Sequence, residues 1–166
     1  MTKTVLAVLA ALSVTGCVVG SNDVATENAY ETGTLKDLTA ARNATAAYHD
    51  IAAATADGYV NSGLPCIEGQ GFHFINGSLI GTNDVTRPHL LLYFPDATGT
   101  LELIALEWIK PIVDDTTTPS TLFGQTFHGP ENVDGVPFSF FGLHVWAWKD
   151  NPDGLFDDTN PRIHCP

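Results

Sequence analysis

The sequence is poor in basic residues: 7 lysines and arginines stand against 19 acidic residues, and the formal net charge is −12. Nucleic-acid binding requires clustered Lys and Arg that neutralise phosphate groups, and the sequence has no basic cluster. Nucleic acid is therefore excluded as a partner. The acidic residues are interpreted as a solvated surface that faces outward, or as weak binders of cations.

Motifs of several common enzyme classes are also missing. The chain contains no nucleotide-binding glycine fingerprint, no G-x-S-x-G nucleophile elbow and no internal repeat. Charged residues make up only 16% of the sequence and apolar residues 44%, which excludes a disordered chain. With 166 residues, the chain has room for one domain with a hydrophobic core.

No apolar run is long enough to cross a membrane as a helix, although the N-terminus is apolar. Residues 1–16 have the pattern of a signal peptide: a short positive start, an apolar stretch and small residues at the cleavage site. The tetrapeptide V-T-G-C that ends at Cys17 resembles the lipobox of bacterial lipoproteins. This resemblance implies lipidation of Cys17 and a membrane anchor on the periplasmic or extracellular face of the cell envelope. The alternative is an ordinary secretory signal with an incidental cysteine.

Residues 17–33 are small and polar, which predicts a flexible tether to a single globular domain at residues 34–166. With Cys17 lipidated, Cys66 and Cys165 remain, and an even pair of cysteines outside the cytoplasm most often forms a disulfide. This bond would close a loop of about 100 residues and stabilise the fold by roughly 4–5 kcal/mol. Metal ligation is the competing interpretation, but neither cysteine belongs to a C-x-x-C pair.

The domain is predicted to begin with one long helix. Thr34 is a suitable N-cap, helix-permitting residues rich in Ala continue from Leu35 to Asp57, and Gly58 supplies a stop. Apolar side chains recur at helical spacing and are mostly small, which predicts a helix that lies close against a sheet.

The pattern then changes to strands and turns. Apolar or aromatic runs at 72–75, 89–94, 101–109 and 137–148 predict strands, and the second and third of these should form a hairpin. The predicted fold class is α+β. The long N-terminal helix packs on a curved, mainly antiparallel sheet of about five or six strands, or on a partly closed β-barrel.

Three titratable side chains interrupt these apolar strands. Glu107 alternates on one face with apolar residues such as Leu103 and Ile109, where a lone ionised carboxylate would be costly to bury. His73 is flanked by two phenylalanines and His144 by two aliphatic residues. If the sheet curves, the three can converge into a facial metal site with open positions, suited to iron, manganese, copper or zinc.

Two other interpretations of these residues stay open: they line an apolar pocket for a small ligand, or they are hydrogen-bonded polar groups of the core. His128 and Glu68 lie in glycine-rich loops that could fold over a pocket, so each is a candidate additional participant. In a regular strand Trp146 and Trp148 share the face of His144. They are therefore predicted to form an aromatic wall that excludes water and grips an apolar or sugar-like ligand.

Motifs spread over residues 46–166, about three quarters of the chain, resemble those of an uncharacterised family of bacterial exported proteins. They are A-D-G-Y, G-F-H-F-I-N, L-L-L-Y-F-P, A-L-E-W, L-F-G-Q, L-H-V-W-A-W, N-P-D-G-L-F and N-P-R-I-H-C-P. The resemblance implies an exported domain, and three of the motifs contain His73, Glu107 and His144; it implies no particular activity. A weaker similarity to cupin-type metal barrels rests on the glycine ahead of His73 and on histidines and a glutamate spread over strands, but the cupin H-x-H pair is absent.

The sequence therefore predicts an exported, lipid-anchored protein with a His/Glu metal site in an aromatic pocket. The leading hypothesis is a metal-dependent enzyme acting on a small or sugar-like substrate, or a metal-binding protein. The alternative is a non-catalytic lipoprotein that binds a small molecule or a protein partner. In that case the three polar groups are hydrogen-bonded among themselves.

Overall fold

The computed structural model describes residues 21–166, and their side chains from residue 31 onward. The predicted signal peptide, residues 1–16, and the predicted lipidation site, Cys17, lie outside the described residues. Helix α1 spans Ser21–Thr45. Residues 21–33, for which the composition predicts a flexible tether, are therefore helical in the structure. This segment has no proline, and its one glycine, Gly33, weakens a helix without breaking it.

The helical region is interrupted where the sequence predicts one continuous helix. After α1, a 3₁₀ helix, η1, covers Ala46–His49, and α2 covers Ile51–Ala56. Asp50 separates them, because its backbone is extended and its carboxylate accepts a hydrogen bond from the backbone N–H of Ala52 at 2.9 Å. Asp50 thus starts a new helix as an N-cap.

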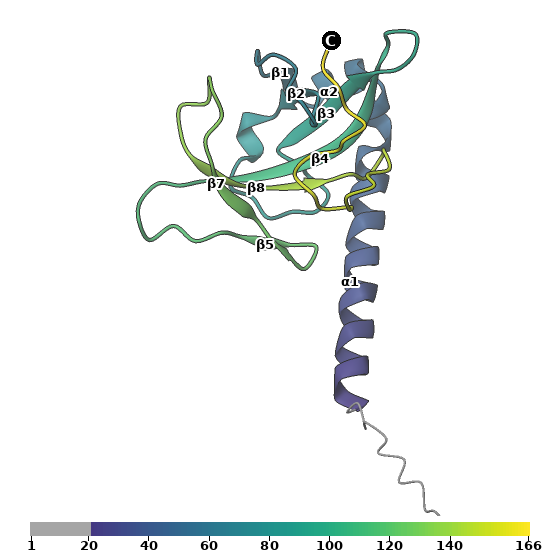
Figure 1. The fold of residues 1–166 in the computed structure, drawn as a ribbon, viewed down its shortest axis with the longest axis vertical. Coiled ribbons are helices and arrows are strands. Elements are labelled where there is room, and N and C mark those ends of the chain that lie inside the picture. Colours follow the sequence, from purple (N-terminus) through teal and green to yellow (C-terminus); the bar gives the residue numbers. More distant parts are fainter. Residues whose placement is uncertain (1–20) are drawn as a thin grey trace, which may run out of the picture.

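Of the two predicted helix ends, one is confirmed and the other is wrong. Gly58 has a φ of +93° and follows α2, so the predicted glycine stop is confirmed. Thr34 lies inside α1, and its hydroxyl donates to the carbonyl oxygen of Phe123 at 3.0 Å, so the predicted N-cap is wrong. Leu38 and Ala41 are buried in the core, whereas the start of α1 runs past the sheet (Figure 1). Among the α1 side chains that the structure describes, those in the core clusters thus lie toward its C-terminal end.

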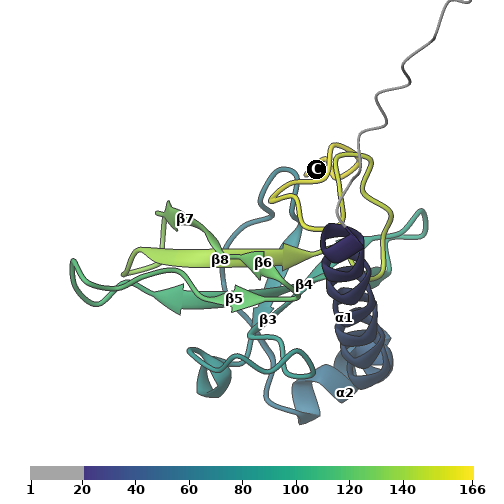
Figure 2. The same cartoon turned by 90° about the horizontal axis from the view of Figure 1, so that it is seen from below.

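Six strands form one antiparallel sheet in the order β1-β2-β3-β4-β8-β7, and β5 and β6 form a separate hairpin (Figures 1 and 2). The strands are β1 (Val60–Asn61), β2 (Phe72–Ile75), β3 (Leu90–Pro95), β4 (Leu101–Pro111), β5 (Thr121–Leu122), β6 (Gln125–Thr126), β7 (His128–Glu131) and β8 (Phe140–Val145). A short 3₁₀ helix, η2, covers Gly77–Leu79. The predicted α+β class, the mainly antiparallel sheet and the β3–β4 hairpin are confirmed.

The sheet is open, so the predicted partly closed barrel is wrong for the described part of the chain. The edge strands are β1 and β7, and they do not pair with each other. β1 has only two residues, which offers too few backbone groups to close a ring of strands.

Each face of the sheet has its own hydrophobic core cluster. One cluster contains Leu91 and Trp108 and extends to the helices, whereas the other contains Leu90 and Ile109. Neighbouring residues of a strand thus point to opposite clusters, as the two-residue period of a strand requires. His73, Glu107 and His144 alternate with members of the first cluster and therefore lie on the face of the second.

A bulge in β4 changes this alternation near the site. Leu92 pairs with Ala105 and Tyr93 pairs with Leu103, so Ile104 is the extra residue. Leu103 consequently belongs to the first cluster, on the face opposite to Glu107, and the prediction that these two residues share a face is wrong.

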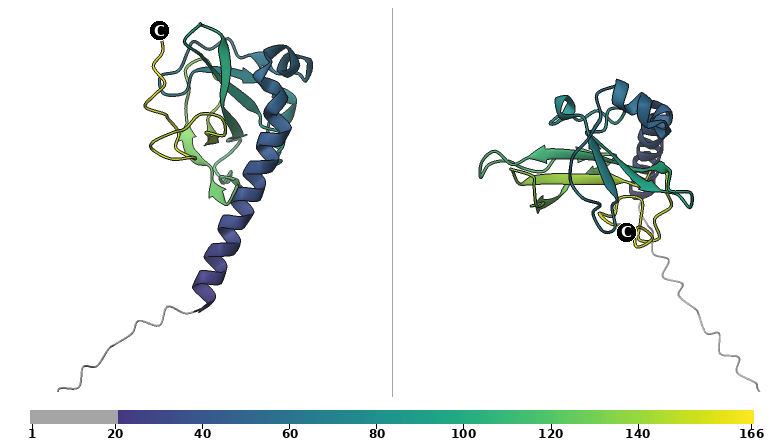
Figure 3. Two further views of the ribbon diagram at one scale, coloured as in Figure 1. Left: turned by 90° about the vertical axis from the view of Figure 1, so that its right-hand side faces the viewer. Right: turned by 90° about the horizontal axis from the view of Figure 1, so that it is seen from above.

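The C-terminal segment covers the second face and is covalently held there. Cys66 and Cys165 form a disulfide with a Cα–Cα distance of 5.7 Å, which confirms the predicted pairing. The backbone of Gly69 also exchanges hydrogen bonds with Asn160 and Ile163. Figure 3 shows the C-terminal segment and α1 on opposite sides of the sheet. A search of the described helices finds none with the length and apolarity of a membrane span.

Candidate metal centre

The three predicted ligands come from three strands of the sheet. Glu107 on β4 and His144 on β8 are direct register partners. His73 on β2 pairs with Leu92 of β3, whereas Glu107 on β4 pairs with Leu90 of β3. Strand β3 therefore lies between His73 and Glu107, and their partners on β3 are two residues apart. The His73 side chain therefore reaches diagonally across β3 to meet Glu107, which a twisted sheet permits.

The side chains converge, as the sequence predicts. His73 Nε2 lies 3.7 Å from Glu107 Oε2, and His144 Nε2 lies 3.8 Å from the same oxygen. One ligand atom from each residue can be chosen so that all three lie within 4.8 Å of one another. His73, Glu107 and His144 are only 4%, 3% and 1% exposed. The three residues are thus close enough to hold a metal ion.

Several buried atoms of this group lack a hydrogen-bond partner among the described residues. They are Nδ1 of His73, Oε2 of Glu107 and both ring nitrogens of His144. Distances of 3.7 and 3.8 Å are too long for hydrogen bonds between these groups. Buried polar atoms are normally paired, so this cluster departs from the usual interior.

Burial also shifts the proton affinities at the centre. Loss of water raises the pKa of Glu107 to about 7, against an opposing effect of the nearby His144. Burial lowers the pKa of His73 to about 3, so its ring is neutral at pH 7. Burial disfavours a charged His144 as well, but the carboxylates of Glu107 and Asp158 outweigh it and raise the pKa of this ring.

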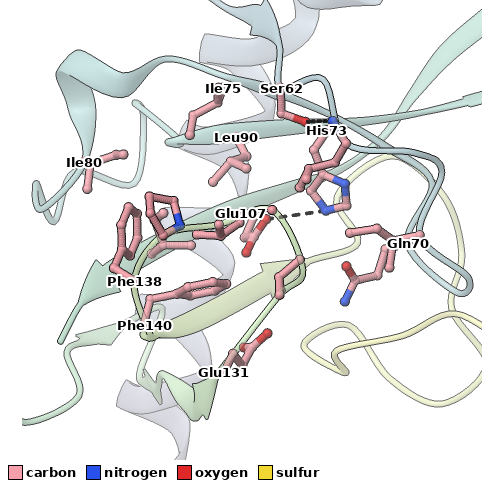
Figure 4. A pocket seen from close by; sticks show the side chains of 17 residues that line it. Ser62, Gln70, His73, Ile75, Ile80, Leu90, Glu107, Glu131, Phe138 and Phe140 are labelled. Carbon is pink, nitrogen blue, oxygen red and sulfur yellow. Dashed lines mark hydrogen bonds and ion pairs between the residues drawn. The ribbon is translucent and has the colours of Figure 1, made fainter.

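A cavity of about 210 Å³ opens above His73 and Glu107 (Figure 4). Apart from Ser62, Gln70, His73, Glu107 and Glu131, the side chains that line it are aliphatic or aromatic. Figure 4 shows Phe138, Phe140, Ile75 and Leu90 around it, with the carboxylate of Glu107 reaching toward His73. His144 is not among the lining residues and lies behind Glu107. A molecule in the cavity would approach the centre from the side of His73 and Glu107.

Glu131 on β7 is a site residue that sequence reasoning missed. Its Oε1 is buried without a hydrogen-bond partner, and burial raises the pKa of its carboxyl. Gly142 on β8 makes room for it, because a Cβ added there would lie 2.7 Å from Glu131 Oε1 and 3.6 Å from Glu107 Oε1. Glu131 follows a Gly-Pro pair in a short edge strand, so no periodic pattern singles it out.

His128, a predicted additional participant, reaches the centre only through a second missed residue, Asp158. His128 Nδ1 lies 2.6 Å from Asp158 Oδ1, and the same oxygen lies 3.8 Å from Nδ1 of His144. Burial of Asp158 opposes its charge, but its interactions with the nearby His144 and His128 prevail and lower the pKa of the carboxyl. Asp158 is thus placed behind His144, on the side away from Glu107.

Glu68, the other predicted participant, does not lie with the three ligands. Its carboxylate accepts hydrogen bonds from the backbone N–H of Cys165, at 2.9 Å, and pairs with Nδ1 of His164, also at 2.9 Å. These contacts fasten the C-terminus beside the disulfide. Glu68 is two-thirds exposed and belongs to the scaffold of the loop.

The predicted wall of tryptophans is also wrong, because neither indole lines this cavity. Trp146 belongs to the second cluster, on the face of His144, whereas Trp148, beyond the end of β8 at Val145, packs against the first cluster on the opposite face. The indole N–H of Trp146 donates to the carbonyl of Asp157, and that of Trp148 to the hydroxyl of Thr45. Both indoles thus hydrogen-bond to neighbouring segments of the chain. The aromatic side chains that line the cavity are those of Phe138 and Phe140.

The two distances from Glu107 to the histidines fit a metal after a small contraction, while the three ligand atoms all lie within 4.8 Å of one another. Ligand atoms about 2.1 Å from a tetrahedral metal lie roughly 3.4 Å apart. The separations of 3.7 and 3.8 Å exceed this by a few tenths of an ångström. Two imidazoles and one carboxylate are a donor set that transition metals accept with open coordination positions.

Comparisons of the chain with protein-family models, with curated proteins and with solved structures found no match. The functional argument therefore depends on the site itself.

Proposed function

We propose that this protein is an exported metal-binding protein in which His73, Glu107 and His144 hold one divalent transition metal at the base of the cavity. One observation carries the proposal: three buried ligand groups from three strands face one another without hydrogen bonds. A cation between them gives each group a partner. Iron, manganese, copper and zinc all suit this donor set, and measurement must choose among them.

A purely structural role for the three residues agrees less well with the contacts. Buried polar groups in a stable core satisfy one another, and breaking such pairs costs about 1–3 kcal/mol for each group. Here both ring nitrogens of His144 lack a partner although the ring is only 1% exposed. The unpaired ring nitrogens therefore support a metal-binding site.

The same geometry supports a metal-dependent enzyme that acts on a small molecule. A metal bound by three protein ligands keeps positions for water or substrate and acts as a Lewis acid or activates water or dioxygen. The chain itself supplies a cavity with apolar walls, which exclude bulk water. It also holds the carboxylate of Glu131 beside Glu107. Few lining groups suit the hydroxyls of a sugar, so an apolar small molecule is the proposed substrate.

Binding without reaction is the second candidate function. The predominance of aliphatic and aromatic side chains around the cavity favours it, because such walls hold apolar molecules without chemistry. Recovery of a bound molecule in unchanged form from the metal-loaded protein would favour this candidate over the enzyme.

The export part of the proposal rests on the resemblance of residues 14–17 to a lipobox and on the disulfide, which is typical of compartments outside the cytoplasm. We propose that Cys17 carries the lipid anchor. Metabolic labelling with a fatty acid should mark the protein, and Cys17→Ser should abolish the label. A label that survives this substitution would refute the anchor.

Elemental analysis of the purified full chain tests the metal site directly. We expect one transition-metal ion per chain, which a chelator removes and which returns on reloading. A ligand that binds only the folded state stabilises that state. Reloading with free metal at 100 times its dissociation constant should therefore add about 2.7 kcal/mol to the free energy of unfolding.

Variants separate the site from other histidines. His73→Gln and His144→Gln should each lose the metal, whereas His164→Gln, which alters an exposed histidine beside Glu68, should keep it. Near-ultraviolet circular dichroism checks that each variant is folded. A folded chain that binds no transition metal and is not stabilised by any would end the proposal.

A further inference from the structure

One end of the cavity is apolar. Figure 4 places Gln70 and His73 toward one side, Ile80 and Phe138 toward the other, and Glu107 between them. Gln70 is held there because its side-chain amide donates to the carbonyl of Asp158 at 3.1 Å. A molecule that fills this space therefore needs an apolar body and a single polar end.

The charge of the lining sets what that polar end can be. Two carboxylates, Glu107 and Glu131, line the cavity, and none of the lining residues is a lysine or an arginine. The ring of His73 is deeply buried, and its Nε2 faces Glu107. An anionic group would therefore meet two carboxyl side chains, and only the metal could attract it, because no basic side chain lines the cavity. Without the metal, the cavity disfavours carboxylates, sulfates and phosphates.

Glu131 needs a donor that the protein does not supply. Its Oε1 is buried and has no hydrogen-bond partner among the described residues, and it lies beside Glu107 over Gly142. A carboxylate in this position is best satisfied by an N–H or O–H group of a ligand. The ligand should thus carry a donor where the cavity meets the metal centre.

We propose that the cavity binds a small neutral molecule made of an apolar body and a hydroxyl group, an alcohol or a phenol, whose O–H donates to the carboxylate of Glu131. A hydroxyl both donates and accepts, so its oxygen can face the metal while its proton faces Glu131. This inference rests on the proposed function and names the substrate class for the same site.

The size of the cavity limits the apolar body. An apolar cavity of about 150 Å³ can hold benzene. The present cavity of about 210 Å³ accommodates one ring with a short substituent, or an alkyl group of similar bulk. Long acyl chains and fused ring systems exceed this volume and would extend out of the cavity.

A matched set of probes tests the polar group on one apolar body. Benzyl alcohol and toluene are titrated into the zinc-loaded full chain in a calorimeter. We expect benzyl alcohol to bind at least about tenfold more tightly than toluene, because hydrogen bonds to charged groups contribute more than neutral ones. Benzoate is titrated into the metal-free chain, where no zinc can bind its carboxylate, and there it should bind at least as weakly as toluene. Equal binding of toluene and benzyl alcohol, or tighter binding of benzoate than of toluene to the metal-free chain, would overturn the inference.

Substitution of Glu131 shows whether this residue recognises the hydroxyl group of the ligand. Glu131→Leu should remove the preference for benzyl alcohol over toluene, and Glu131→Gln should weaken it and improve the binding of benzoate. Asp115→Asn removes one negative charge from an exposed loop and should leave both ratios unchanged. An unchanged preference in Glu131→Leu would refute the assigned role.

Metal content, measured on the same samples, separates the two proposals. A chain that binds no metal refutes the proposed function; the probe series on that metal-free chain then decides the inference alone, since Glu131 still lines the cavity. A metal-loaded chain that shows no preference for the hydroxyl refutes the inference and leaves the metal site in place.

Discussion

Glu107 and His144 stand directly opposite each other on β4 and β8, and Oε2 of Glu107 lies 3.8 Å from Nε2 of His144. Neither atom has a hydrogen-bond partner among the described residues, and both side chains are almost fully buried. Two complementary groups held this close without a hydrogen bond between them leave a position for a third species. In the proposed function that species is a metal ion, which His73 also contacts.

Asp158 should tune the metal affinity from behind His144. Residues that contact the far nitrogen of a ligating histidine fix its orientation, and their loss typically weakens metal binding by about 10–100-fold. Because Asp158 Oδ1 is 3.8 Å from His144 Nδ1, we expect the lower end of this range for Asp158→Asn. Competition with a chelating dye measures the affinity. Asp153→Asn, in an exposed turn, is the control, and equal affinities in the two variants would contradict the role.

Gly142→Ala should disturb Glu131 while sparing the fold. The new methyl group would lie 2.7 Å from Oε1 of Glu131, a flexible side-chain end that can move, but only in normal contact with Glu107. We expect the chain to retain its metal and to lose most of the preference for benzyl alcohol over toluene. Gly77→Ala, where nothing lies within 4 Å, should change neither property. Loss of metal in Gly142→Ala would show that Glu107 had moved as well.

Acidification should destabilise the metal-free protein partly through His89. This fully buried ring accepts a hydrogen bond from the N–H of Ile109, and its Nε2 lies 3.0 Å from the carbonyl oxygen of Thr82. Burial, the largest effect, lowers the pKa of His89 below its usual 6.5. The unfolded chain therefore binds more protons than the folded chain between the lowered pKa and 6.5. This contribution to stability is fully present above pH 6.5 and is lost as the pH falls through the lowered value.

Urea unfolding at several pH values measures this contribution. His89→Gln should unfold at lower urea than the wild type at pH 7.5, and its stability should depend less on pH between 4 and 6.5. His164→Gln, at an exposed position, serves as the control for loss of a histidine. A pH dependence in His89→Gln as steep as in the wild type would assign the effect to other groups.

The disulfide should contribute a large share of the stability. Cys66 and Cys165 are 99 residues apart, and a loop of about 100 residues corresponds to roughly 4.7 kcal/mol on the chain-entropy model. We expect the double variant Cys66→Ser/Cys165→Ser to lose about 4–5 kcal/mol in free energy of unfolding. Urea titration measures the loss, and Cys17→Ser should not change it. Free thiols assigned to Cys66 and Cys165 in the denatured, unreduced protein would contradict the bond.

The sequence by itself determined the local features of this protein. Apolar runs at 72–75, 89–94 and 101–109 identify strands that the structure places within a residue or two, because a strand buried on both faces needs such runs. The same alternation shows that His73, Glu107 and His144 interrupt buried strands. The count of cysteines predicts the disulfide, since two thiols remain once Cys17 is set apart.

Only the tertiary structure decided which of these residues meet. β8 lies next to β4 although residues 112–139 of the chain lie between them, and that pairing places His144 opposite Glu107. The pairing of β7 with β8 brings in Glu131, and the contact of the C-terminal segment with His128 brings in Asp158. The tryptophans Trp146 and Trp148 pack on opposite faces of the sheet, and neither lines the cavity. Side-chain alternation is a local property with a period of two residues, whereas strand order, register and bulges depend on which segments pair across the whole chain.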